Sequence, residues 1–104
     1  MIRKPAVAGQ FYSSSSQGLS ETFDGYVEDN SGKVRAIGIV SPHAGLMYSG
    51  EVAGAVYSQI EFPGTFVILS PNHTGMGSLV SIMSSGEWEI PTGSLMIDEE
   101  LAER

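Results

Sequence analysis

The stretch VRAIGIVSPHAGLMYSGEVAGAVYSQIEFPGTFVILSPNH, residues 34–73, decides which fold we expect for this chain. Two short apolar runs, 34–40 and 65–70, each lead into a Ser-Pro step, which is typical of a buried strand. Between these runs, apolar residues recur at helical spacing, namely Val52, Ala53, Val56, Tyr57 and Ile60. Strand, helix and strand in this order predict a right-handed βαβ unit with parallel strands.

The chain has two histidines, and they occupy matching places in this unit. His43 lies in SPHAG and His73 lies in SPNHTG, each shortly after one of the expected strands. Parallel strands end at a common edge of the sheet, where open α/β folds bind their ligands. Because imidazole is the commonest protein ligand of transition metals, we predict that both histidines bind one metal ion. The alternative is that each ring only stabilises its own loop through hydrogen bonds.

Two further side chains could support chemistry at this edge. Tyr48 can donate a hydrogen bond or a proton, and Asn72 can orient a substrate, so we predict both as catalytic residues. The alternatives are that Tyr48 packs against the following helix and that Asn72 forms an Asx-turn. A third metal ligand is not evident, because Glu51 is the nearest carboxylate and is expected to face solvent from a helix.

The flanking segments are expected to complete a single α/β domain over residues 1–104. The tract SSSS can cap a helix whose apolar face would consist of Leu19, Phe23, Tyr26 and Val27. A further strand is predicted over 79–85, a loop or hairpin over 86–98, and a last helix capped by Asp98. That helix has barely begun at Arg104, so we expect the chain to be a fragment of a longer domain.

Composition narrows the classes of function. The chain has 104 residues and a formal net charge of −7, so binding to nucleic acid phosphates is not expected. It has no cysteine, which excludes disulfides and thiolate ligands from this chain. No nucleotide-binding glycine motif is present. Without a signal peptide or an apolar run of about 18 residues, we expect a cytoplasmic protein with no membrane segment.

Several motifs resemble, in order and spacing, those of the Memo family, known in microbes as AmmeMemoRadiSam system protein B. They are RKPAVAGQFY, PHAGLMYSG, SPNHTGMGS, WEIPTG and IDEELAE. The resemblance covers essentially the whole chain, but only the front portion of the family, whose members run to well over twice this length.

The resemblance implies an α/β sandwich around a central, largely parallel sheet, like that of the LigB-type extradiol dioxygenases. It implies that His43 and His73 are metal ligands, that the third ligand is a cysteine far downstream, and that the metal is iron or copper. In the family, an aromatic residue is common at the position of Leu46 and a proline at the position of Ser13. These two departures do not involve the ligand positions His43 and His73. Microbial members have no established reaction, and the animal relative resembles a protein that binds phosphotyrosine-bearing partners.

The leading hypothesis is therefore a dioxygenase-like, metal-dependent oxidoreductase in which His43 and His73 hold iron or copper, supported by Tyr48 and Asn72. The alternative is a non-catalytic module that binds a peptide or phosphopeptide in the same cleft. A sheet edge left exposed in this fragment would also favour homo-oligomers.

Overall fold

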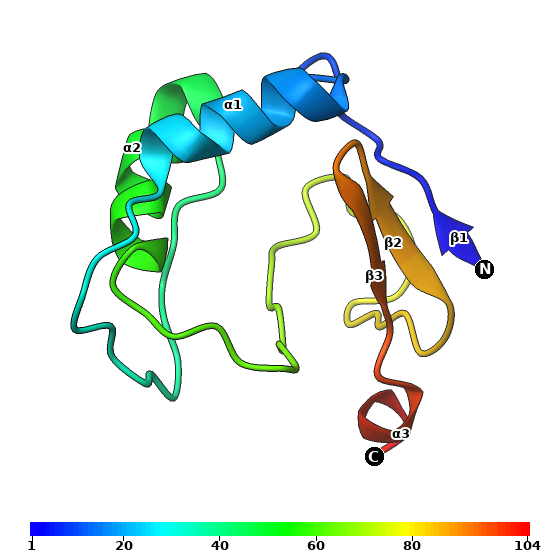
Figure 1. The fold of residues 1–104 in the computed structure, drawn as a ribbon. Coiled ribbons are helices and arrows are strands. Elements are labelled where there is room, and N and C mark those ends of the chain that lie inside the picture. Colours follow the sequence, from blue (N-terminus) through cyan, green and yellow to red (C-terminus); the bar gives the residue numbers. More distant parts are fainter.

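The computed structural model describes residues 1–104 and combines three helices with a three-stranded sheet (Figure 1). The elements are β1 (Ile2–Arg3), α1 (Ser16–Tyr26), α2 (Leu46–Tyr57), β2 (Glu87–Ile90), β3 (Gly93–Met96) and α3 (Glu99–Ala102). In the sheet, β1 pairs in parallel with β2, and β2 pairs antiparallel with β3. The chain is therefore an α/β structure with a small mixed sheet.

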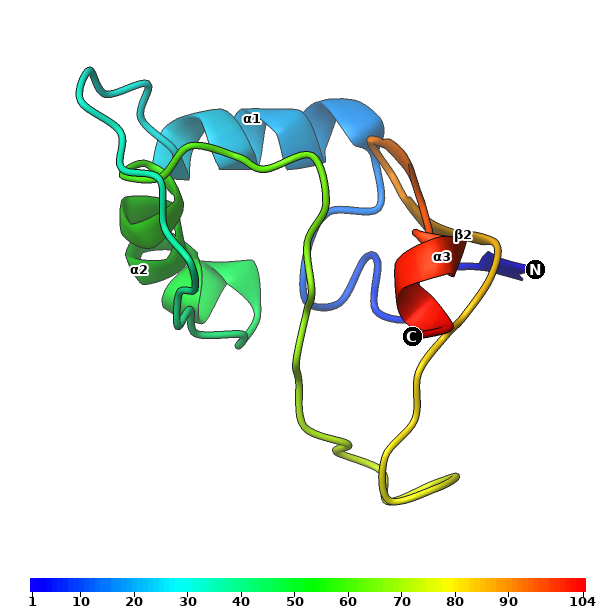
Figure 2. The same ribbon diagram turned by 90° about the horizontal axis from the view of Figure 1, so that it is seen from below.

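The helices and the sheet occupy different parts of the molecule. Figures 1 and 2 show α1 and α2 together on one side, with the sheet and α3 on the other. The long segment between α2 and β2 passes between these two parts without regular structure. None of the three helices has the length and apolar composition that crossing a bilayer requires.

The helix predicted after the serine tract is confirmed as α1. The side chain of its N-cap, Ser15, accepts a hydrogen bond from the Gly18 amide at 3.0 Å, which satisfies one free donor of the first turn. Leu19, from the expected apolar face, is the most buried hydrophobic residue of the chain at 3% exposure. Phe23 of the same face stays 42% exposed, so α1 buries only part of its apolar surface.

The contact between α1 and α2 depends on two glycines of α2. Gly50 and Gly54 lie one turn apart, and both are buried against Tyr26 at the end of α1. A Cβ on Gly50 would lie 2.6 Å from the Tyr26 ring, and one on Gly54 would overlap the Tyr26 carbonyl group. Only glycine allows backbones to approach this closely.

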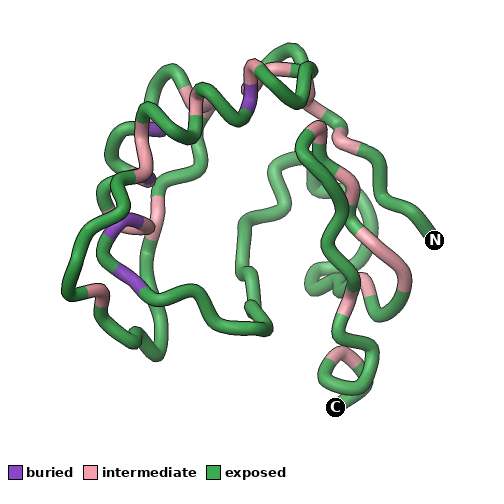
Figure 3. Tube along the Cα trace, viewed as in Figure 1, coloured by how far each residue is buried: buried purple, intermediate pink, exposed green.

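The buried residues gather around this helix pair (Figure 3). Five of 104 residues are buried, namely Leu19, Gly50, Gly54, Ser58 and Ile60. The Ser58 hydroxyl donates to the Gly54 carbonyl at 2.6 Å and accepts from the Glu28 amide at 2.7 Å. Ser58 therefore ties the end of α2 to the chain that leaves α1.

The predicted βαβ unit does not form in this structure, and the strand predictions for 34–40, 65–70 and 79–85 are wrong for it. Residues 34–40 make a single bridge, between Val34 and Ile60, and residues 65–70 make no backbone hydrogen bond. Parallel strands are stable when both faces are covered. Here no helix covers these runs, and Ile37 and Leu69 remain 110% and 92% exposed, so no burial drives their pairing.

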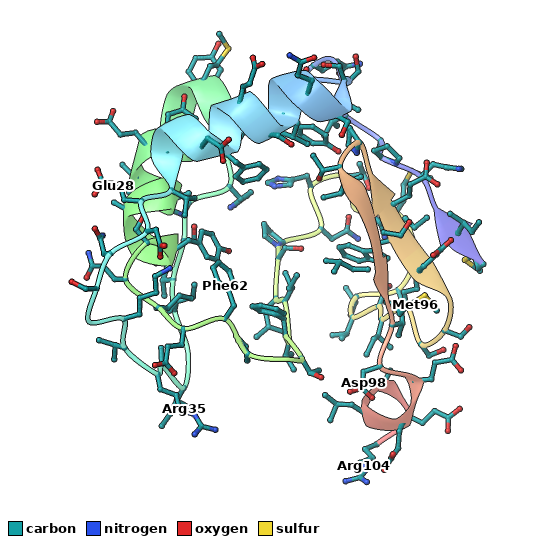
Figure 4. All side chains as sticks on the ribbon, in the orientation of Figure 1. Glu28, Arg35, Phe62, Met96, Asp98 and Arg104 are labelled. Carbon is teal, nitrogen blue, oxygen red and sulfur yellow. The ribbon has the colours of Figure 1, made fainter.

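Element boundaries also differ from expectation. The helix predicted from the apolar residues between Val52 and Ile60 begins at Leu46, with Gly45 as its N-cap, and ends at Tyr57. The Ser49 hydroxyl donates to the Ala44 carbonyl at 3.3 Å. The last helix is confirmed as α3, and its N-cap Asp98 accepts from the Leu101 amide at 3.0 Å (Figure 4). The expected hairpin over 86–98 is present as β2 and β3.

Candidate metal centre

The structure brings the two histidines together although the strands expected to carry them do not form. The Nε2 atoms of His43 and His73 lie 3.0 Å apart. Their ring centroids are 5.2 Å apart, and the ring planes are tilted by 37°. Both residues are exposed, so the pair is open to ligands from solvent. At this separation the two atoms can form a hydrogen bond, in which one Nε2–H donates to the other Nε2.

The spacing of the two nitrogens fits a metal ion. At a metal–nitrogen distance of about 2.1 Å, two nitrogens in adjacent octahedral positions lie about 3.0 Å apart, and two in tetrahedral positions about 3.4 Å apart. The Nε2 atoms of His43 and His73, at 3.0 Å, match the first arrangement. Imidazole nitrogens suit iron, copper and zinc. The donor set therefore fits a transition metal, because its two nitrogens have the spacing of adjacent ligands.

No third candidate ligand lies beside the two histidines in the structure. No group of three or more His, Asp, Glu or Cys side chains lies close enough together to hold a metal ion. Glu51, the nearest carboxylate in the sequence, is exposed on α2. A metal ion held by His43 and His73 alone would leave its other coordination positions to water or to further donors.

His43 precedes α2, and its loop is anchored to the N-terminal part of the chain. The Leu46 amide, in the first turn of α2, donates to the Phe11 carbonyl at 2.9 Å. Phe11 belongs to a turn in which the Gly9 amide donates to the Tyr12 carbonyl at 2.7 Å. The position of His43 therefore depends on a contact between α2 and residues 9–12.

His73 lies in a loop that is held by the side chain of its neighbour. The Asn72 Oδ1 atom accepts hydrogen bonds from the amides of Thr74 at 3.2 Å and Gly75 at 3.0 Å. Its Nδ2 group donates to the Met76 carbonyl at 2.8 Å. The alternative of an Asx-turn for Asn72 is therefore observed, and a direct catalytic role for this residue stays a prediction.

Tyr48 occupies the first turn of α2. Its side chain is 80% exposed, so it does not pack against the helix as the alternative proposed. Its hydroxyl has no hydrogen-bond partner in the chain, and no hydrogen bond joins it to His43 or His73. Tyr48 is accessible for interaction with a ligand, and its predicted catalytic role remains a prediction.

A cleft lies beside the start of α2, and no sequence motif indicated it. This cleft has a volume of about 520 Å³ and is lined mainly by residues 9–14, with Thr22, Tyr26, Leu46 and Met47. Its size is that of a site for a small ligand or a peptide side chain. Neither histidine lines it, but Leu46 connects it to the loop of His43. Such a cleft depends on which segments meet in space, so no local motif identifies it.

Comparison with known proteins identifies the family. The model of the family described as Memo-like protein matches residues 3–104. A MEMO1 family protein of Methanothermobacter thermautotrophicus is 47% identical over 115 residues, which cover 99% of this chain and 42% of the relative. A MEMO1 family protein of Aquifex aeolicus is 42% identical over 106 residues, which cover 99% of this chain and 39% of the relative. No solved structure matches the chain.

The chain is shorter than the relatives that it matches. The chain spans about 40% of the length of the curated relatives it matches, namely 42% and 39% of the two named above. The matched region includes both histidine motifs, the β2–β3 hairpin and α3. The family model and the identity to these relatives together show that the chain belongs to the Memo-like protein family.

Proposed function

We propose that this chain supplies a two-histidine half-site for a redox metal, iron or copper, in a dioxygenase-like protein. One observation carries the proposal, namely the 3.0 Å separation of the Nε2 atoms of His43 and His73. Two exposed imidazoles at the spacing of adjacent ligands, with no third ligand beside them, leave coordination positions open for a substrate. When bound, the metal would supply the capacity to bind and activate dioxygen or a small substrate.

Residues of the chain would assist at the open side of this site. The Tyr48 hydroxyl can donate a hydrogen bond or a proton to a bound ligand, because it is exposed and has no hydrogen-bond partner in the chain. Asn72 has its Oδ1 atom engaged within the loop and retains one N–H of its amide for a ligand. Neither role needs rearrangement of the backbone.

We also propose that the segments 34–40 and 65–70 become parallel strands of a LigB-like sandwich in the complete fold. Both are extended, apolar and largely without hydrogen-bonding partners in this chain. The curated relatives contain more than twice the matched length, which is enough to cover them. A second copy of the chain pairing along these segments is the homo-oligomer expected from exposed strand edges.

A second candidate function is recognition of a peptide or phosphopeptide without catalysis. The cleft of about 520 Å³ favours it, because tyrosines, serines and exposed backbone line a volume that suits a peptide side chain. Met47 lines this cleft and is 76% exposed, so Met47→Asp should not disturb the folded core. Fluorescence anisotropy with tyrosine-phosphorylated and unmodified peptides should show binding that Met47→Asp abolishes; equal binding by the variant would exclude the cleft.

The metal site is tested by titration with Fe(II) under anaerobic conditions and with Cu(II). We expect the wild-type chain to bind one equivalent, and the His43→Ala/His73→Ala variant to bind none. Because both histidines are exposed, their removal should not unfold the protein, which circular dichroism can verify. Equal binding by wild type and variant would show that the pair is not a metal site.

A further inference from the structure

The Asn72 side chain forms a closed hydrogen-bond network around His73. Its Oδ1 atom accepts three hydrogen bonds, from the Thr74 amide, the Thr74 hydroxyl and the Gly75 amide. Its Nδ2 group donates to the Met76 carbonyl at 2.8 Å, and the Met76 amide donates back to the Thr74 hydroxyl at 3.3 Å. The backbone after His73, from Thr74 to Met76, is therefore tied to the side chain of the residue before it.

Apart from its contact with His43, the His73 ring has no hydrogen-bond partner that orients it. Metal-binding histidines normally donate their second ring nitrogen to a carboxylate or a carbonyl, which orients the ring. In this structure the only hydrogen bond of the His73 ring is the one to His43. The preceding segment, 65–70, makes no backbone hydrogen bonds, and residues 71–80 are all exposed. The loop network therefore contains the hydrogen bonds that define the backbone at His73.

The chemistry of the network requires an asparagine. Its oxygen faces two backbone N–H groups while its nitrogen faces a carbonyl, so the side chain must accept on one side and donate on the other. An aspartate would place a second oxygen against the Met76 carbonyl. A serine hydroxyl could accept hydrogen bonds from the amides, but its shorter side chain could not also donate to the Met76 carbonyl.

We propose that Asn72 is a positioning residue, which acts on the metal half-site through His73, whether or not its remaining N–H also contacts a ligand. As far as the metal is concerned, this inference rests on the proposed function. The positioning itself is a property of the metal-free chain, because the contact between His43 and His73 exists without a metal. The two statements can therefore be tested separately.

The first test uses the metal-free chain. Nuclear Overhauser effects between the ring protons of His43 and His73 should be present in the wild type, strongly reduced in Asn72→Ala and partly restored in Asn72→Ser. The matched control is Asn30→Ala, because Asn30 is the other asparagine, is exposed, and lies far from this loop in sequence. Ring contacts in Asn72→Ala equal to those of the wild type would overturn the inference, as would their absence from the wild type.

The second test measures metal affinity with Cu(II). Removing groups that orient a ligating histidine typically weakens metal binding by about 10–100-fold, and we expect at least about tenfold for Asn72→Ala. The melting temperature should stay unchanged, because Asn72 contacts none of the buried residues. Wild-type affinity in Asn72→Ala would overturn the inference and leave the proposed function intact. If the wild type binds no metal, the proposed function fails, and the ring contacts alone decide the role of Asn72.

Discussion

Replacing Gly54 by alanine should destabilise the protein, although alanine is the better helix former. In an exposed helix this change would stabilise the fold by about 1 kcal/mol. In α2, however, the new Cβ would overlap the backbone carbonyl group of Tyr26, which cannot rotate away as a flexible side chain could. The outcome depends on which of these two effects is larger.

The structure indicates that the overlap dominates. Forcing an extra methyl group into a packed contact costs about 1–3 kcal/mol, and the backbone overlap at Gly54 places it near the upper end. Subtracting the gain in helix propensity leaves a net loss of about 2 kcal/mol. For a domain of this size that corresponds to a decrease in melting temperature of about 8–16 °C.

A matched glycine in α1 provides the control. A Cβ on Gly25 would meet no atom within 4 Å, so Gly25→Ala should gain stability, by at most about 1 kcal/mol. Urea and thermal unfolding followed by circular dichroism would measure both variants. The two should shift in opposite directions. If Gly54→Ala were as stable as the wild type, or both variants shifted in the same direction, the close contact between α2 and Tyr26 would be refuted.

Three further predictions concern single side chains. Ser58→Ala should cost about 1 kcal/mol of unfolding free energy, because it removes the part-buried hydrogen bond from the Glu28 amide to the Ser58 hydroxyl, and urea unfolding would show this. Asp98→Ala should raise the hydrogen-exchange rates of the α3 amides with little change in melting temperature, because it removes an N-cap worth about 1 kcal/mol from a peripheral helix. Tyr48→Phe should leave the melting temperature and metal affinity unchanged while lowering any oxidative turnover, since its hydroxyl is free; a loss of stability would contradict its exposed position.

Features encoded by local chemistry could be predicted from the sequence. The apolar face containing Leu19, the capping carboxylate of Asp98 and the turn between β2 and β3 each depend on neighbouring residues, and each is observed. The run 65–70 has the composition of a buried strand, but a strand also needs a partner and a covered face, which composition does not supply. Likewise, the contact of Gly54 with Tyr26 depends on how two helices cross.

In the candidate site too, features that depend on neighbouring residues could be predicted from the sequence, and features that depend on distant contacts could not. Repeated motifs predicted that His43 and His73 would meet, and they do, but through their loops and not through paired strands. The Asx-turn of Asn72 was one of two alternatives, because an asparagine before a histidine suits either a turn or a substrate contact. Which alternative holds depends on the backbone path from residue 74 to 76, which the sequence pattern does not specify.

Binding of one metal ion by both His43 and His73 can be tested by pulsed electron paramagnetic resonance of the Cu(II)-loaded protein, because modulation by the remote imidazole nitrogens distinguishes one bound ring from two. We predict two imidazoles on one copper ion in the wild type and one in either His43→Ala or His73→Ala. A single imidazole in the wild type, or a spectrum that neither substitution changes, would contradict it.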